Sequence, residues 1–344
     1  VGAIRAGQLG KKVAVVEMDR AGGTCLNWGC IPTKSLLKNA EVYQTIKNHA
    51  GDFGLKVEGL AYEWDKVIGR SRKVADRLAG GIEMLFKKNK VDYIRGEAAI
   101  PKAGVVEVTD KDGKKSELKS EKILIATGVV SREMPGFPFN GKSVIGSRQA
   151  MVVDPQPKDI IIIGAGAIGI EFAYFFNAFG TKVTVVEMMP NILPVEDTEV
   201  SQALEKSLAK QGIKLLTSTK VDKAETTNKG VRLTVSGKAT ETLEAAIALV
   251  AIGVSPLLPK GVVLETDAKG YLKTNAAYET SVRGIYAAGD IIGPPWLAHV
   301  ASYEAVQCIE GLFAGKKPQK VTVFPGCTYC QPQVASVGLT ERAA

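Results

Sequence analysis

The sequence predicts an α/β fold in which helices cover both faces of parallel sheets, giving a three-layer arrangement. With 344 residues the chain is long enough for two domains with their own cores. Its composition, 45% hydrophobic with 36 glycines, suits a globular protein with many tight turns between strands and helices. Residues 13–17 and 160–163 have the continuous apolar character of buried parallel strands.

The most complete pattern covers residues 160–187. A buried strand at 160–163 is followed by GAGAIG at 164–169, a helix through Phe179, and a second strand at 182–186 that ends at Glu187. Strand, glycine turn, helix, strand and acid in this order form the dinucleotide-binding fingerprint. We expect Glu187 to accept hydrogen bonds from the adenosine ribose and to repel a 2′-phosphate, which favours NAD over NADP. The expected contacts are Gly164, Gly166, Ala167, Ile168, Gly169 and Glu187.

Residues 22–34 read GGTCLNWGCIPTK and hold two closely spaced thiols, Cys25 and Cys30. Such a pair can close a small ring by oxidation and reopen it by accepting two electrons, as a redox switch does. A helix beginning near Cys25 would favour the reactive thiolate. The alternative is a pair of buried thiols with no redox role. A metal site is not expected, because His49 is distant and no second cysteine pair lies nearby.

With strand 13–17 closing on Glu17, these motifs resemble the flavin-dependent pyridine nucleotide-disulfide oxidoreductases, and among them the dihydrolipoamide dehydrogenases. The resemblance runs from Val1 to about Arg342. It implies two dinucleotide-binding, Rossmann-like domains. FAD binds residues 1–154 and 282–318, NAD binds 155–281, and 319–344 begin an α+β dimerisation domain that is largely absent. In the family a strand and glycine loop precede the first helix, so we expect a chain truncated at both ends.

The resemblance also implies a role for individual residues. Cys25 is expected to exchange thiols with the substrate, and Cys30 to face the flavin. Lys34 is expected to reach the flavin and to pair with Glu171. The expected FAD contacts are Glu17, Gly23, Thr24, Lys34, Ala98, Ala126, Thr127, Gly128, Asp290, Trp296, Leu297, Ala298 and His299, while Val221 and Gly253 join the NAD contacts. Asp290 could instead be a turn aspartate, and His299 a packed core histidine.

The expected reaction passes electrons from dihydrolipoamide to the cysteine disulfide, then to FAD and then to NAD+. The family's histidine base lies in a C-terminal motif of the partner subunit, and neither His49 nor His299 sits in such a motif. From the two missing ends we expect weak flavin retention and diaphorase-like turnover. Two alternatives stay open: an NAD-binding fragment without turnover, and a glutathione- or mercuric-reductase-type enzyme. Glu187 and the Asn27, Trp28 and Thr33 pattern argue against the second.

Composition limits the remaining classes of function. The net charge of +8 comes from scattered lysines without a binding motif, so no nucleic-acid partner is expected. No run of about eighteen apolar residues predicts a membrane span, and no signal-peptide pattern opens the chain. Five cysteines, an odd number, favour a reducing compartment, and we interpret Cys327 and Cys330 as buried structural thiols. The resemblance implies a lipoyl domain as partner, a homodimer, and a bacterial cytoplasm or mitochondrial matrix.

Overall fold

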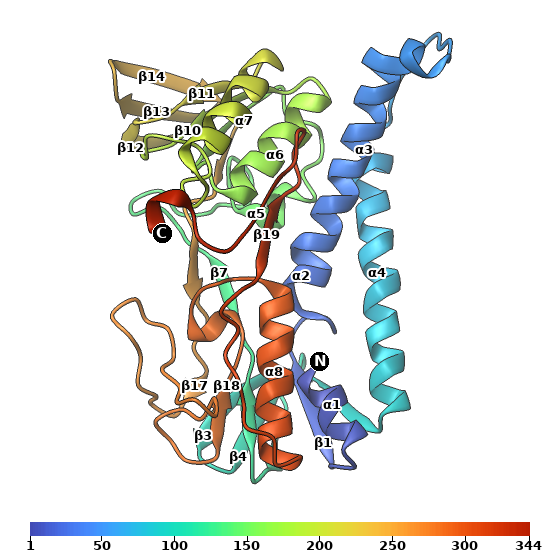
Figure 1. The fold of residues 1–344 in the computed structure, drawn as a ribbon, viewed down its shortest axis with the longest axis vertical. Coiled ribbons are helices and arrows are strands. Elements are labelled where there is room, and N and C mark those ends of the chain that lie inside the picture. The colour runs from blue at the N-terminus through green and yellow to red at the C-terminus, as the bar shows by residue number, and fades with distance from the viewer. The chain divides into compact units, whose positions relative to one another are not determined.

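A computed structural model describes residues 1–344, which form two compact units (Figure 1). Unit 1 contains Val1–Cys25, Asp76–Val130 and Val254–Phe324, and unit 2 contains Leu26–Ala75, Ser131–Gly253 and Pro325–Ala344. The first boundary falls inside a short helix, directly after Cys25. No helix is both long and apolar enough to cross a membrane.

Unit 1 combines small sheets with two packed helices. Its elements are α1 (Gly2–Gln8), β1 (Val13–Glu17), β2 (Val91–Arg95), β3 (Glu97–Lys102), β4 (Val105–Thr109), β5 (Lys115–Lys119), β6 (Ile123–Ile125), β16 (Val254–Pro256), β17 (Lys260–Gly261), β18 (Ile285–Ala287), η2 (Asp290–Ile292) and α8 (Ala298–Phe313). Three elements cross its boundaries: α2 (Gly23–Trp28), α4 (Trp64–Lys88) and β7 (Val129–Ser131), of which β7 pairs with β16.

Two parallel strand pairs organise unit 1. Strand β1 pairs with β2, and β6 pairs with β18, while β17, β3, β4 and β5 form a separate four-stranded sheet. Helix α1 packs on α8, where Arg5 Nη2 lies 2.6 Å from the carboxylate of Glu310. The carboxyl ends of parallel strands are where α/β proteins bind ligands, so the residues that follow β1, β6 and β18 are the first candidates for a site.

Unit 2 is built on a parallel five-stranded sheet. Its elements are α3 (Cys30–His49), η1 (Ala50–Phe53), β8 (Val144–Ile145), α5 (Ser147–Ala150), β9 (Asp159–Ile163), α6 (Ala167–Ala178), β10 (Lys182–Val186), α7 (Thr198–Lys210), β11 (Lys214–Leu216), β12 (Lys220–Thr227), β13 (Gly230–Ser236), β14 (Thr240–Ala245), β15 (Ile247–Val250), β19 (Pro325–Thr328), β20 (Val334–Val337) and η3 (Glu341–Ala343). The sheet order is β11-β10-β9-β15-β8, so the strand order reverses beside β9. An antiparallel sheet, β12-β13-β14, and the hairpin β19-β20 complete the unit.

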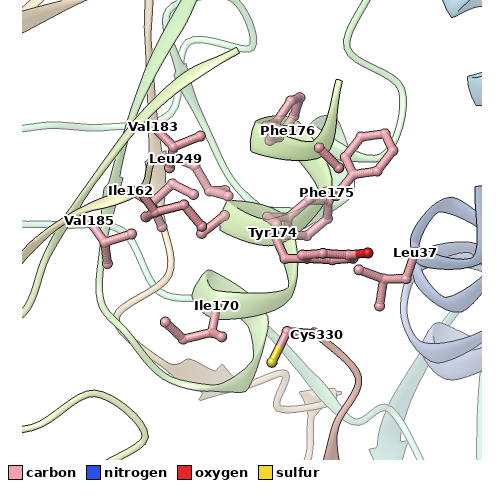
Figure 2. Close-up of a cluster of buried hydrophobic side chains, with 14 of the residues drawn as sticks. Leu37, Ile162, Ile170, Tyr174, Phe175, Phe176, Val183, Val185, Leu249 and Cys330 are labelled. Atoms are coloured by element: carbon pink, nitrogen blue, oxygen red, sulfur yellow. The ribbon is translucent and has the colours of Figure 1, made fainter. Parts of the chain in front are cut away.

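Helix α6 forms the centre of the main core of unit 2. Most of its residues are buried, as a helix that is apolar on nearly all sides requires, and the buried set includes the carboxylate-bearing Glu171. Figure 2 shows Tyr174, Phe175 and Phe176 of α6 among strand side chains such as Ile162, with Leu37 of α3 on the other side. The unit therefore holds α3 and the strand-to-helix turn before α6 in one packed body.

The predicted α/β fold class is confirmed, and the element boundaries differ in three places. The sequence predicts a helix over Ser35–Asn48, and helix α3 begins earlier, at Cys30, because Pro32 lies in the first turn, where its missing N–H costs nothing. The strand expected over 91–100 is interrupted at Gly96, where a Cβ atom would lie 2.6 Å from Val108. The strand expected over 117–126 likewise divides into β5 and β6.

Candidate active site

The two cysteines of the predicted switch are joined in a disulfide at the junction of α2 and α3. Gly22 precedes α2 and Gly23 begins it, with positive φ angles of 107° and 70° that glycine adopts without strain. Cys30 is the first residue of the 20-residue helix α3, so the amide-rich end of the helix faces this position. Such an environment favours a thiolate when the disulfide opens. The expectation of a disulfide between Cys25 and Cys30 is confirmed.

Lys34 lies on α3 just over one turn after Cys30 and meets two groups of unit 2. Its ammonium Nζ stands 4.0 Å from the ring centroid of Tyr329. The main-chain N–H of Tyr329 in turn donates to Glu171 Oε1 of α6, over 2.9 Å. Burial raises the pKa of the Glu171 carboxyl, while the charge of Lys34 and the Tyr329 hydrogen bond act in the opposite direction. Lys34 and Glu171 are thus electrostatically coupled, with Tyr329 in contact with both.

The thiols of the β19–β20 hairpin differ from each other. Cys330 is fully buried beside Ile170 and Tyr174 (Figure 2), and its Sγ donates to the carbonyl of Pro332 over 3.1 Å. Burial raises the pKa of Cys330 to about 12, so the thiol stays protonated. Cys327 is only partly buried and forms a hydrogen bond with the side chain of Tyr329. Burial also raises the pKa of the Cys327 thiol. The interpretation as a buried structural thiol therefore suits Cys330 better than Cys327.

Four predicted flavin contacts in unit 1 lie at the carboxyl ends of parallel strands. Glu17 ends β1, and its Oε1 accepts the main-chain N–H of Asp19 over 2.8 Å. After β6 the chain turns through Ala126 and Thr127 to Gly128, which has a φ of 69°. The Thr127 hydroxyl donates to the carbonyl of Leu257 over 2.5 Å. These residues keep exposed or partly exposed backbone at the strand ends, as a ligand site there requires.

Asp290 follows β18 and carries an unusual carboxyl group. Burial and the nearby charge of Glu304 raise the pKa of Asp290 to about 6. Glu304 Oε2 accepts the main-chain N–H of Gly289 over 2.8 Å, and burial also raises the pKa of Glu304. The hydroxyl groups of a flavin's ribityl chain would supply hydrogen-bond donors to such a carboxylate. The residues present therefore fit the flavin expected here.

The remaining flavin contacts lie on open parts of unit 1. Gly23 has no atom within 4 Å of the position that a Cβ would occupy, and Thr24 beside it is exposed. Ala98 is exposed on β3 opposite Val108. Four contacts surround the start of α8: Trp296, Leu297, Ala298 and His299. His299 is exposed, which rules out the alternative of a packed core histidine, and Trp296 is 46% exposed.

The predicted NAD loop lies between β9 and α6 of unit 2. Gly164 has a φ of 103°, and a Cβ there would stand 2.5 Å from the Ala251 carbonyl oxygen. A Cβ on Gly169 would collide with the carbonyl oxygen of Gly164, so this glycine allows the helix to lie against the strand. Gly166 caps α6 and has open space where a Cβ would point. The loop thus offers free helix amides and room for a pyrophosphate.

Glu187 is buried against this loop. Its Oε2 accepts the main-chain N–H of Ala165 over 2.7 Å, and its Oε1 accepts that of Met189 over 2.8 Å. The carboxylate is thereby fixed at the carboxyl end of β10, next to the helix start that contains Ala167 and Ile168. The other two predicted contacts are Val221 on β12 and Gly253 after β15, where φ is 112° and no atom lies within 4 Å of a Cβ position.

Four residues of these sites were not predicted. Tyr329 contacts both Lys34 and Glu171, and Glu304 raises the pKa of Asp290. Arg72 and Arg148 stand over the ring of Trp28 between the two cysteines. Each acts across segments far apart in the chain, where sequence spacing carries no signal.

Comparison with known proteins identifies the family of this arrangement. The family model described as pyridine nucleotide-disulphide oxidoreductase matches residues 1–305. A dihydrolipoyl dehydrogenase of Rhizobium etli is 44% identical over 368 aligned residues that cover 100% of this chain and 76% of the relative. One of Chlorobaculum parvum is 42% identical and covers 99% and 74%. A crystal structure of LpdA from Mycobacterium tuberculosis has a TM-score of 0.89 at 25% identity, covering 99% of this chain and 77% of that one. The chain thus spans about three quarters of these relatives.

Proposed function

Because the chain belongs to the pyridine nucleotide-disulphide oxidoreductase family, we propose that it catalyses the flavin-dependent oxidation of dihydrolipoamide by NAD+. The observation that supports this most is the Cys25–Cys30 disulfide at the start of α3, with Lys34 just over one turn further on. Relatives that are 41–44% identical over nearly the whole chain are dihydrolipoyl dehydrogenases.

The disulfide takes the electrons of the substrate by thiol exchange. One thiolate of dihydrolipoamide attacks the sulfur of Cys25, the S–S bond breaks, and Cys30 leaves as a thiolate. The second substrate thiol then attacks the mixed disulfide, releases oxidised lipoamide and leaves Cys25 reduced. Two electrons have then passed to the protein; the proton of the second substrate thiol goes to Cys25, and the first proton goes to solvent while Cys30 stays a thiolate. The start of α3 stabilises the thiolate at Cys30, which makes this cysteine the better leaving group.

Unit 1 supplies the residues that would hold FAD. Glu17, Thr127 and Asp290 follow strand ends, and the exposed start of α8 around Ala298 adds free main-chain amides. Bound FAD supplies the two-electron step between the cysteine pair and NAD+. We assign residues 1–154 and 282–318 to the FAD-binding domain, and residues 319–344 to the start of the dimerisation domain.

Unit 2 supplies the residues that would hold NAD. Gly164, Gly166 and Gly169 shape the loop, and the Glu187 carboxylate stands where it would accept hydrogen bonds from the hydroxyl groups of a ribose. We assign residues 155–281 to the NAD-binding domain. Lys34 and Glu171 would adjust the charge near the reacting ring, with Tyr329 holding both.

Likeness to dihydrolipoyl dehydrogenases supports a finer proposal for the partner. We propose that the substrate is a dihydrolipoyl group on the lipoyl domain of a 2-oxo acid dehydrogenase complex or glycine cleavage system, and that the whole protein works as a homodimer. We place the reaction in a bacterial cytoplasm or a mitochondrial matrix, since the pea relative is mitochondrial.

The assay that tests this function follows NADH formation from dihydrolipoamide and NAD+ after the chain has been incubated with FAD. For the whole protein we expect NADH formation that depends on FAD and is lost in Cys30→Ser, and for this chain we expect diaphorase-like transfer of electrons from NADH through FAD to an artificial acceptor. The reverse assay with NADH and NADPH separates the alternatives, because a glutathione- or mercuric-reductase-type enzyme would prefer NADPH. Absence of activity in the presence of bound, yellow flavin would contradict the proposal.

A further inference from the structure

The tryptophan between the two cysteines is contacted by two arginines of unit 2. The guanidinium carbon of Arg148 stands 4.0 Å from the ring centroid of Trp28, and that of Arg72 stands 4.7 Å from it. Arg72 also donates through Nη1 to the main-chain carbonyl of Asn27, over 2.9 Å. Asn27 itself is only 1% exposed. The segment between the cysteines is therefore held by two separate side chains.

The helix that carries this segment is too short to keep its place alone. Helix α2 has six residues and ends at Trp28, directly before Gly29 and the start of α3. Helices of this length are marginal in water, and the last carbonyls of a helix have no partner within it. The Arg72 hydrogen bond to Asn27 satisfies one of these carbonyls.

The two arginines come from elements with their own anchors. Arg72 lies on α4, which is tied to α3 where Arg70 Nη1 donates to the Ser35 hydroxyl over 2.9 Å. Arg148 lies on α5, which packs against β8 and β15 of the central sheet. The ring of Trp28 is thus fixed from the helical layer and from the sheet at once.

We propose that Arg72, Trp28 and Arg148 act as positioning residues, a clamp that keeps Cys25 and Cys30 aligned when the disulfide is open. In the oxidised protein the S–S bond itself joins α2 to α3. After reduction no covalent link remains between the two cysteine side chains, and they must return to a bonding distance of about 2 Å before the pair can be reoxidised. The clamp maintains the alignment during that half of the cycle.

The clamp rests on the proposed redox role of the disulfide. Measuring the thiol–disulfide equilibrium tests the clamp and that redox role separately. The chain, without added FAD, is equilibrated with mixtures of reduced and oxidised dithiothreitol, trapped by alkylation, and analysed by mass spectrometry of the peptide that contains both cysteines. Two electrons and two protons pass from dithiothreitol, which closes to its cyclic disulfide, and the protein S–S bond breaks. A disulfide that never opens reversibly would count against the proposed function as well.

We expect Trp28→Leu to shift this equilibrium about tenfold toward the dithiol, which is about 30 mV, because loosened thiols have a lower effective concentration for each other. Arg148→Gln should shift it in the same direction, and since Arg148 is exposed this variant keeps the test valid if Trp28→Leu does not fold. Trp28→Phe keeps an aromatic ring, so its thiol–disulfide equilibrium constant should stay close to that of the original chain. The matched control is Lys47→Gln, which removes a cation 5.8 Å from the Tyr43 ring on α3 and should change nothing.

Amide exchange gives a second readout. Reduction should leave exchange of residues 24–30 nearly unchanged in the original chain and should accelerate it in Trp28→Leu. An unchanged equilibrium in both Trp28→Leu and Arg148→Gln would overturn the clamp. A shift toward the disulfide would overturn it too, because the guanidinium groups would then act by stabilising thiolate charge rather than by alignment.

Discussion

Tyr329 contacts Lys34 through its ring, with Nζ 4.0 Å from the ring centroid, and its main-chain N–H binds the buried carboxylate of Glu171. One residue of the β19–β20 hairpin therefore touches both charged groups that were expected to pair. Of these two charged groups the Tyr329 side chain contacts only Lys34, since the bond to Glu171 uses the backbone. A substitution at Tyr329 can thus remove the aromatic ring beside the Lys34 ammonium without removing the main-chain hydrogen bond to Glu171.

We expect Tyr329→Leu to lower the free energy of unfolding by about 1 kcal/mol, because the ammonium loses its aromatic partner. Tyr329→Phe keeps the ring, so its free energy of unfolding should remain close to that of the original chain. Urea unfolding of the three chains measures the difference. If both substitutions cost the same, the stabilising group is the phenol that bonds Cys327 rather than the ring.

The glycine loop before α6 provides a pair of substitutions with opposite effects. Gly169→Ala should destabilise the fold by about 1–3 kcal/mol, since the added methyl group would collide with the carbonyl oxygen of Gly164. Gly166→Ala meets no atom within 4 Å and should unfold like the original chain, yet weaken NAD binding at the loop. Urea unfolding and calorimetric titration with NAD separate the two. Equal NAD affinity in Gly166→Ala would contradict the position assigned to the pyrophosphate.

Glu187 should make the chain prefer NAD to NADP by at least about tenfold, which corresponds to about 1.4 kcal/mol. The reason is that its carboxylate, fixed by the amides of Ala165 and Met189, would face the 2′-phosphate. Glu187→Arg should narrow or invert that preference, and Glu187→Gln should show how much comes from charge alone. Isothermal titration with both nucleotides gives the ratio. Equal affinities in the unmutated chain would refute the ribose assignment.

Asp290 should make the flavin-free chain less stable as the pH rises from about 4 to about 6. The pKa of Asp290 is raised from 3.8 to about 6 in the folded chain, so in this window the native state holds a proton that the unfolded state has released. Stability contributed by the protonated form is therefore lost as the pH increases. The loss is on the order of 2 kcal/mol after allowance for solvent screening.

Urea unfolding at pH 4.5 and 7 measures this change. Asp290→Asn cannot ionise, so it should flatten the dependence of the unfolding free energy on pH. A smaller pH dependence of the same sign should remain from Glu304. Burial raises the pKa of that carboxyl, although the charge of Lys320 acts in the opposite direction. Identical pH profiles for Asp290→Asn and the original chain would contradict the assignment.

Local patterns explain why much of the fold could be predicted. Strand β10 occupies 182–186 as expected, because a run of Val and Thr residues is bounded by a turn and by Glu187. The apolar residues of 64–88 recur at helical spacing, which predicts a helix, and α4 covers this range. The start of α3 at Cys30 is harder to predict, because it depends on Pro32 being tolerated in the first turn of a helix.

Contacts between segments that are far apart in the chain could not be predicted from the sequence. Nothing near Trp28 indicates that Arg148, on a different element, will stand over its ring. Nothing near Lys34 indicates Tyr329 either, since an aromatic ring and an ammonium on separate elements have no characteristic spacing. The disulfide could be predicted because both of its cysteines lie within one short, distinctive segment.

Reduction of the Cys25–Cys30 disulfide by dihydrolipoamide tests the central claim most directly. The chain is exposed to dihydrolipoamide, alkylated, and analysed by peptide mass spectrometry, with Cys25→Ser as the comparison. We predict that Cys25 and Cys30 become alkylated only after reduction, while buried Cys308 and Cys330 are modified to the same small extent in both states. A disulfide that dithiothreitol opens but dihydrolipoamide leaves intact would contradict the account.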